Sequence, residues 1–409
     1  MRSDSAEPAT SGLASYSDLF RTREFTPFFG AASAQGVAQT MGGLALGTLV
    51  YRATDSPLLS ALSMFGASLA QVLGATLLLS AADRLPPRAA LTSLSLAFAA
   101  TTALMAVPSL PIWGIFAVLL VKGLAASVGG GVRWGLLNEI LTKDGYLLGR
   151  SVFNMMSGVT QITGYATGGA LLALLSPRTI LLLSVALYAA AAATLHLGLR
   201  TRPPRATGRP SLKTTWRTNA RLWSSAPRRH IYLALWIPNG LVVGCESLYV
   251  PYAPASAGAL FACAALGMLA GDVLVARFLP ARTRRRAGIP LLLLLAAPYT
   301  LFALHPPLPV SVFLVTLASA GFGASLVQQE RLLDLTPPTL TGHALGLHSS
   351  GMLTMQGVSA TLAGTLAQLT SPAWTMTTLA TTSLAVTGAL GWAMRGEGAG
   401  RGGGVGGLP

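Results

Sequence analysis

Residues 179–199 read TILLLSVALYAAAAATLHLGL, a run that holds no aspartate, glutamate, lysine or arginine. Arg178 precedes the run and Arg200 follows it. About 20 mainly apolar residues are enough for a helix to cross the ~30 Å hydrocarbon core of a bilayer. Only helices and closed barrels satisfy their backbone hydrogen bonds in lipid, and this run is far too long for a barrel strand. It therefore predicts a transmembrane helix.

The same pattern recurs along the whole chain. We expect twelve transmembrane helices, at about 27–50, 57–80, 88–107, 112–132, 149–175, 179–199, 231–250, 255–278, 288–304, 309–329, 344–369 and 373–394. Of all residues 52% are hydrophobic and 10% are charged, and the mean hydropathy is +0.58. An average soluble domain carries about 25% charged residues. The composition excludes a soluble enzyme and a disordered protein, and it indicates an all-α polytopic membrane protein.

The positions of the cations predict how these helices cross the membrane. If both termini are cytoplasmic, Arg52 and Arg178 lie in outward-facing segments and Lys122 lies within a span, while every other lysine and arginine faces inward. That distribution follows the positive-inside rule. We therefore expect a multi-pass plasma membrane protein with both termini in the cytoplasm. The net charge of +15 then belongs to loops beside anionic lipid, and no nucleic-acid partner is expected.

A basic segment divides the chain into two halves. Residues 200–229 hold nine cations and no acid. Within them, spacings of 4, 4 and 3 would place four apolar residues on one helix face: Leu212, Trp216, Ala220 and Trp223. The segment is either a basic amphipathic helix at the membrane surface or a disordered basic linker. The expected organisation is a cytoplasmic segment, a six-helix bundle, the linker, a second six-helix bundle and a Gly-rich cytoplasmic tail, at 1–26, 27–200, 201–229, 230–395 and 396–409.

Short similarities recur at a separation of about half the chain. Asp83–Arg88 (DRLPPR) corresponds to Arg277–Arg282 (RFLPAR), and Gln161 of the fifth span corresponds to Gln356 of the eleventh. Matches in the same order at nearly the same separation indicate parallel repeats, from which many transporters build two bundles.

Two motifs carry a resemblance to a known family. Residues 79–88 read LSAADRLPPR, and residues 160–169 in the fifth span read TQITGYATGG. The chain resembles the major facilitator superfamily, in which the corresponding patterns are G-x-x-x-D-R-x-G-R-R and G-x-x-x-G-P-x-x-G-G. It is most similar to the drug:proton antiporters and enterobactin-exporter-like efflux proteins. The resemblance implies the major facilitator fold, with twelve transmembrane helices in two six-helix bundles.

Three residues of each motif match the corresponding family pattern. Asp83, Arg84 and Arg88 match the first motif, which here lacks its two glycines and one arginine. The matches to the antiporter motif of the fifth span are Gly164, Gly168 and Gly169. In that motif Thr160 replaces the first glycine and Tyr165 replaces the proline.

The resemblance also implies a cytoplasmic gate. In the family, acids and arginines at cytoplasmic helix ends form ion pairs that hold this side shut. In this chain these positions are Asp83, Arg84, Arg88 and Glu139 in the first half, with Asp272, Arg277 and Glu330 as the counterpart in the second. At the edge of lipid such pairing is stronger than in water. The alternative is ordinary surface charge that follows the positive-inside bias.

Two ionisable residues lie well inside expected spans. A charge near the middle of a bilayer costs ~2.5–3.5 kcal/mol or more, so such residues usually face a cavity or each other. Lys122 lies near the middle of the fourth span, and Glu246 lies in the outer half of the seventh, which we expect to be unwound near Pro238. One hypothesis is that Glu246 gains and loses a proton during transport while Lys122 tunes it or contacts substrate. The alternatives for Glu246 are contact with a cationic substrate and a structural role.

Several polar side chains within spans are candidates for lining a central cavity: Gln35, Gln39, Gln71, Asn154, Gln161, Asn239 and Gln356. Hydrogen bonding between helices explains such residues equally well.

The sequence favours secondary transport. It contains no phosphate loop of a primary pump, no H-E-x-x-H and no cluster with zinc spacing, so neither an enzyme nor a cofactor or metal is expected. We predict proton-driven efflux of small amphipathic molecules (a drug, siderophore or secondary metabolite) by a monomer in the lipid bilayer. Proton-coupled uptake of a small polar or anionic solute, supported by Lys122, is the alternative, and a membrane-embedded sensor or enzyme is a remote one.

Overall fold

The computed structural model describes residues 16–77, 85–204 and 212–402 of the chain, so Asp83 and Arg84 of the predicted gate lie outside the described residues. The first half contains α1 (Tyr16–Arg21), α2 (Phe25–Thr54), α3 (Pro57–Leu77), α5 (Pro87–Met105), α6 (Ile112–Ile140), α7 (Lys143–Leu172) and α8 (Pro177–Gly198).

The second half begins with α9 (Leu212–Trp223). It continues with α10 (Ala226–Glu246), α11 (Tyr249–Tyr252), α12 (Ala257–Val273), η1 (Leu274–Phe278), α13 (Ala281–Ala296), η2 (Ala297–Leu304), α14 (Leu308–Ala320), η3 (Gly321–Gly323), α15 (Ala324–Asp334), η4 (Pro338–Leu340), α16 (Thr341–Leu369) and α17 (Pro372–Gly402).

The expected spans fall on these helices. Eight described segments are long and apolar enough to cross a membrane, and the remaining four spans fall on α2, α7, α16 and α17, each of at least 29 residues. No strand occurs in the described part of the chain. The prediction of an all-α polytopic membrane protein with two six-helix bundles is therefore confirmed.

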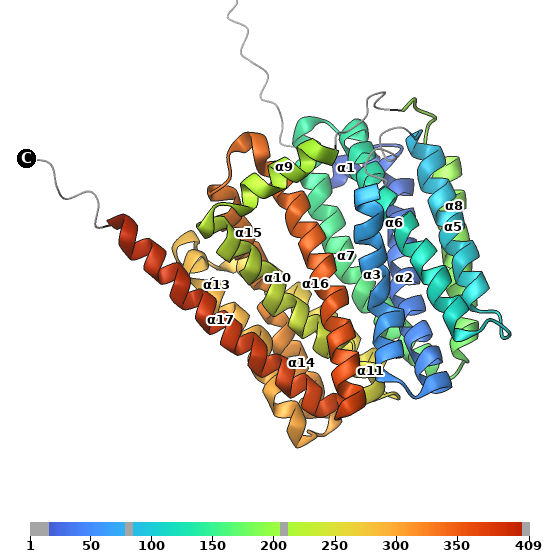
Figure 1. Ribbon diagram of the computed structural model, residues 1–409. Helices are drawn as coiled ribbons and strands as arrows, with labels where there is room; N and C mark the ends of the chain where they lie inside the picture. The colour runs from blue at the N-terminus through green and yellow to red at the C-terminus, as the bar shows by residue number, and fades with distance from the viewer. Residues whose placement is uncertain (1–15, 78–84, 205–211, 403–409) are drawn as a thin grey trace, which may run out of the picture.

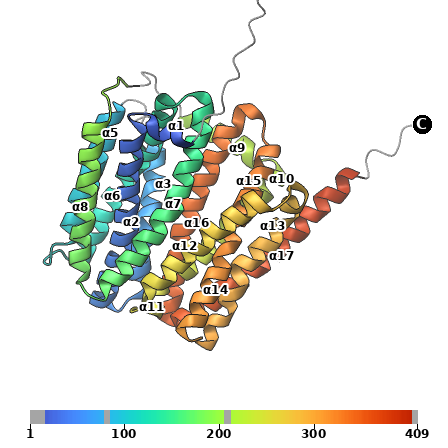
Figure 2. The same ribbon diagram turned by 180° about the vertical axis from the view of Figure 1, so that it is seen from behind.

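Each bundle is held by long helix–helix contacts. In the first, α2 packs against α7 and α8, α5 against α6 and α8, and α3 against α6. In the second, α10 packs against α16 and α17, and α12 packs against α14. The bundles meet along two seams, α3 with α16 (Figure 1) and α7 with α12 (Figure 2).

The two ends of the bundles differ. One end carries α1 and α9 and is called here the α9 face; the opposite end carries α11 and is called the α11 face (Figure 1). Short turns connect helices at the α11 face, where Pro57 and Pro177 occupy the first turns of α3 and α8. Proline suits these positions because the first backbone N–H groups of a helix have no partner within it. At the turn before α3, Asp55 adopts a left-handed φ of 49°.

Residues 212–223 of the linker form the helix α9, so a disordered linker is excluded for that stretch. Trp223 stacks on Trp236 of α10, with ring centroids 5.5 Å apart. The Arg228 guanidinium donates hydrogen bonds to the carbonyls of Arg221 and Leu222, and so ties the end of α9 to α10.

The expectation of an unwound segment near Pro238 is wrong. α10 runs unbroken from Ala226 to Glu246 with Pro238 inside it, and the chain leaves the helix at Ser247 and Leu248 instead. Proline is tolerated inside a transmembrane helix when neighbouring groups satisfy the backbone that it frees. The break thus follows Glu246 directly.

Candidate functional site

A cavity of about 610 Å³ lies between the two bundles. Both bundles contribute to its wall: α2, α3, α5, α6, α7 and α8 from the first, and α10, α12, α15 and α16 from the second. Small-molecule sites typically measure about 300–1,000 Å³ and are mostly apolar with a few placed polar groups. The cavity has the dimensions of such a site.

Contacts between the bundles close the cavity toward the α11 face. The rings of Tyr165 (α7) and Phe261 (α12) stack with centroids 4.7 Å apart. The Gln368 side-chain amide of α16 donates a hydrogen bond to Ser56 Oγ at 2.6 Å, which joins the bundles at the α3–α16 seam. A closed end of this kind denies a substrate passage to the α11 face.

Toward the α9 face the cavity continues to Asp272, near the end of α12, and to Gln329 of α15. No salt bridge joins the two bundles at this face within the described ranges. Figure 2 shows α7 and α12 close together near α11 and diverging toward the opposite end. The structure therefore represents a state open to the α9 face.

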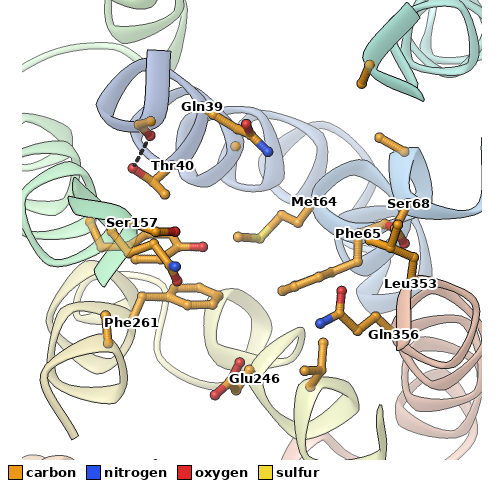
Figure 3. A pocket seen from close by; sticks show the side chains of 18 of the residues that line it. Gln39, Thr40, Met64, Phe65, Ser68, Ser157, Glu246, Phe261, Leu353 and Gln356 are labelled. Atoms are coloured by element: carbon orange, nitrogen blue, oxygen red, sulfur yellow. Dashed lines mark hydrogen bonds between the residues drawn. The ribbon is translucent and has the colours of Figure 1, made fainter. Parts of the chain in front are cut away.

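Glu246 lies on the cavity wall at the last residue of α10. Its half-buried carboxylate has no hydrogen bond or ion pair among the residues that the structure describes. Phe65 and Phe261 line the same cavity, and Figure 3 shows these rings and Gln356 entering the hollow from three other helices. Glu246 is thus a carboxylate that faces the substrate space without a protein partner.

Lys122 lies on the wall of the same cavity, in α6. Its ammonium donates a hydrogen bond to Thr102 Oγ1 at 2.9 Å. It also lies 5.1 Å from the ring centroid of Tyr188 and 5.8 Å from that of Phe98, within the range of cation–π attraction. Lys122 and Glu246 are not within ion-pair distance of each other.

Five of the seven predicted lining residues line this cavity: Gln39, Gln71, Gln161, Asn239 and Gln356. The other two do not. Gln35 is buried between Ser95, to which its amide donates, and Arg133, which donates to its carbonyl oxygen at 3.0 Å. Asn154 is exposed on α7. Polar residues on the same helices therefore serve both roles that the sequence left open.

No salt bridge joins the described gate residues of the first half to those of the second half in this open state. Arg88 contacts Thr201 Oγ1 at 3.1 Å and Glu139 lies 3.6 Å from Arg202, both within the first half. Glu330 pairs with Arg284 of α13, with contacts of 2.9 and 3.0 Å. Asp272 lines the cavity and Arg277 is exposed on η1.

Sequence reasoning missed an ion-pair group at the α9 face. Arg202 forms ion pairs with Glu24 and Glu139. These pairs join the linker to the start of α2 and to the end of α6. Burial alone would raise the pKa of Glu24, but hydrogen bonds from Arg202 and from the Arg200 backbone, with their charges, lower it overall. No local pattern reveals partners 178 residues apart.

Arg133 was missed for a different reason. It lies just after the predicted end of the fourth span, whereas α6 continues to Ile140 and holds the half-buried Arg133 beside Gln35. A span estimate that ends before Arg133 is too short for this helix.

The three motif glycines of α7 sit where helices approach closely. A Cβ on Gly164 would lie 1.7 Å from Thr40 Oγ1 of α2, and one on Gly168 would lie 3.2 Å from Met41. A Cβ on Gly169 would lie 2.7 Å from the Cα of Gly258 in α12. Gly164 and Gly168 thus pack α7 within its bundle, and Gly169 packs it against the other bundle.

Residues 28–329 match the model of the Major Facilitator Superfamily. The chain belongs to this superfamily. No curated protein matches its sequence. Members of the superfamily are transporters, and this protein is accordingly a membrane transporter rather than an enzyme.

Solved structures share this fold at low sequence identity. A POT family transporter in complex with 5-aminolevulinic acid superimposes with a TM-score of 0.73 at 10% identity, covering 92% of this chain and 96% of that one. A bacterial homologue of the human lysosomal transporter Spinster, inward-facing and occupied, gives 0.71 at 12% identity, covering 92% and 97%. The human organic anion transporter MFSD10 (TETRAN) gives 0.63 at 19% identity, covering 90% and 99%. At these identities the likeness concerns the fold of this superfamily member and not its substrate.

Proposed function

We propose that this transporter exports small amphipathic molecules in exchange for protons by alternating access. The observation that carries the proposal is the Glu246 carboxylate, which faces the cavity near its closed end without a partner among the described residues. A carboxylate left ionised in a closed, apolar cavity carries a large desolvation cost. The bundles can therefore close around Glu246 only when a proton or a donor group of the substrate has reached it.

Competition between these two occupants couples their movements. A proton arriving from the α11 face displaces the substrate from Glu246, and loss of that proton to the α9 face lets the next substrate bind. Coupling of this kind requires a ligand to stabilise one conformation more than another. Glu246 meets that requirement because its environment changes from open to enclosed as the bundles rock.

The same proposal assigns directions and gates. The α9 face is taken as cytoplasmic because the cationic linker and loops lie there. We accordingly assign both termini to the cytoplasmic side of the plasma membrane. In the opposite state we assign closure of the α9 face to ion pairs of the first-half group, Asp83, Arg84, Arg88 and Glu139, with the second-half group, Asp272, Arg277 and Glu330. The glycines Gly164, Gly168 and Gly169 then serve as the antiporter-like packing surface of α7.

A second candidate is proton-coupled uptake of an anionic solute. Lys122 favours it, because the ammonium faces the cavity with one hydrogen bond and no carboxylate partner in the described ranges. Uptake reverses the direction of substrate movement and leaves the cavity and its closure unchanged.

The test compares accumulation of fluorescent amphipathic compounds in cells that express the wild type, Glu246→Gln or Asp334→Asn, with and without a protonophore. Asp334 is the matched control because it is an exposed carboxylate at the end of α15, outside the cavity. We expect lower accumulation in wild-type and Asp334→Asn cells, and loss of that difference with Glu246→Gln or the protonophore. Export by Glu246→Gln that still responds to the protonophore would contradict proton exchange at Glu246.

A further inference from the structure

The charged groups of the cavity are divided between its two walls. Lys122 stands on the wall from the first bundle, and Glu246 and Asp272 stand on the wall from the second. Among the described residues none of these three forms an ion pair. Opposite charges that share a low-dielectric cavity without pairing with each other are available to bind charged groups of a ligand.

The first wall presents hydrogen-bond donors. The Lys122 ammonium has three N–H groups, and among the described residues the one hydrogen-bond acceptor that it contacts is Thr102 Oγ1, at 2.9 Å. The rings of Phe98 and Tyr188 flank the cation without accepting its remaining protons as an anion would. This wall therefore fits a carboxylate or another small anionic group.

The second wall presents acceptors. Besides Glu246 and Asp272, it carries Asn239, whose side chain is 94% buried and whose Oδ1 has no hydrogen-bond partner in the described part of the chain. Asn239 and Glu246 are seven residues apart on α10, about two turns, so they share one helix face, and both line the cavity. Buried acceptors without donors are costly. This wall therefore fits an ammonium or another group rich in donors.

We propose that the substrate is dipolar, with an anionic group that contacts Lys122, a cationic group that contacts the Glu246 wall and an apolar body attached to them. The apolar body contacts side chains at the centre of the cavity, including Met64, Phe65 and Phe261 (Figure 3). The inference rests on the proposed export of amphipathic molecules and specifies their charge. A dipolar ligand contacts both bundles through its charges and so favours their closure, whereas a singly charged ligand is held by one bundle alone.

Three probes on one scaffold test the inference. Nε-dansyl-lysine carries an amine and a carboxylate, dansylcadaverine is the same molecule without the carboxylate, and dansyl-aminohexanoic acid is the same molecule without the amine. Their dissociation constants are measured from dansyl fluorescence on the purified full-length protein at one pH, with no gradient. The proteins are the wild type, Lys122→Gln, Glu246→Gln and Arg178→Gln, the last an exposed cation outside the cavity.

The wild type and Arg178→Gln should bind the zwitterion at least tenfold more tightly than either singly charged probe. The zwitterion makes charge-assisted contacts through both of its charged groups, whereas each singly charged probe makes them through one. Lys122→Gln should weaken the zwitterion and the anion at least tenfold and leave the cation unchanged. Glu246→Gln should weaken the zwitterion and the cation and leave the anion unchanged. The unchanged probe in each case shows that the variant is folded.

Similar affinity of the wild type for all three probes would overturn the inference. So would equal weakening of all probes by Lys122→Gln, or no binding of any probe at millimolar concentration. The proposed proton exchange is tested separately, by flux of the bound probe into vesicles with and without a proton gradient. Selective zwitterion binding with flux that ignores the gradient would reject proton exchange alone, and gradient-driven flux without charge selectivity would reject the dipolar substrate alone.

Discussion

Gly258→Ala should weaken closure of the α11 face. A Cβ on Gly258 of α12 would lie 2.3 Å from the Cα of Gly169, 3.0 Å from its N and 3.1 Å from the Tyr165 carbonyl oxygen. All three are backbone atoms of α7, so no side-chain rotation relieves the contact. Since ordinary contact begins at 3.4 Å, α7 and α12 must separate by about 1 Å at this point.

The size of the effect follows from the cost of overpacking. Insertion of a methyl group into a well-packed interface costs about 1–3 kcal/mol. This cost applies to the state closed at the α11 face and is relieved when the bundles part there. A free-energy difference of about 1–3 kcal/mol changes the ratio of two conformations by about 5–150-fold.

Distances between spin labels across the α11 face measure that ratio. Labels at Leu174→Cys, beyond the end of α7, and Ala255→Cys, before α12, occupy exposed positions on the two bundles. The native Cys245 and Cys263 are replaced by serine in all samples. We expect Gly258→Ala to add a longer-distance population to the distribution of the parent protein.

The matched control is Gly388→Ala in α17, where an added Cβ meets no heavy atom within 4 Å. It should leave the distance distribution unchanged. If Gly258→Ala also leaves the distribution unchanged in a folded protein, the Gly169–Gly258 contact does not hold the α11 face shut.

Three further predictions follow from contacts outside the substrate space or at its closed end. Ser56→Ala removes the acceptor of the Gln368 hydrogen bond across the α3–α16 seam. It should change the free-energy difference between the conformations closed and open at the α11 face by about 1 kcal/mol, less than Gly258→Ala. An unchanged spin-label distance distribution would count against that bond as a closing contact. Gln328→Met should raise the free energy of unfolding in detergent by about 1–3 kcal/mol, because Gln328 is fully buried and neither polar atom of its side-chain amide has a hydrogen-bond partner among the described residues. A lower thermal midpoint of the variant would mean that this amide does form hydrogen bonds. Arg202→Ala should destabilise the protein near pH 7, because contact with Arg202 holds the pKa of Glu24 below its ordinary value of 4.5. This stabilisation is present above the unfolded-state pKa and is lost as pH falls through the lowered pKa, so the difference in stability between wild type and variant should shrink on acidification. A difference in stability that is independent of pH would exclude this ion pair as its source.

The transmembrane helices could be predicted from the sequence because bilayer thickness sets a length that hydropathy reveals directly. The run at 179–199 became α8 at Pro177–Gly198. The same reasoning placed Arg133 just outside the fourth span, because hydropathy falls there although the helix continues to Ile140 and Arg133 donates a hydrogen bond to Gln35.

The candidate site could be predicted only in part. Lys122 and Glu246 were found because ionisable residues in apolar spans are rare, and both line the cavity. Lys122 and Glu246 do not form an ion pair because of how the two bundles are placed relative to each other, and the sequence around either residue does not indicate that placement. Gly258 was not singled out because the chain has 45 glycines, and only the packed helices show which of them meet another backbone.

The most direct test of proton exchange measures proton movement and substrate movement together. Proteoliposomes that contain the wild type or Glu246→Gln, with a pH-sensitive dye trapped inside, receive Nε-dansyl-lysine from outside without any other ion gradient. We predict that substrate entry through the wild type drives protons out and raises the internal pH, and that Glu246→Gln shows no such change. Substrate entry accompanied by an unchanged or falling internal pH would contradict proton exchange and favour uniport or uptake with protons.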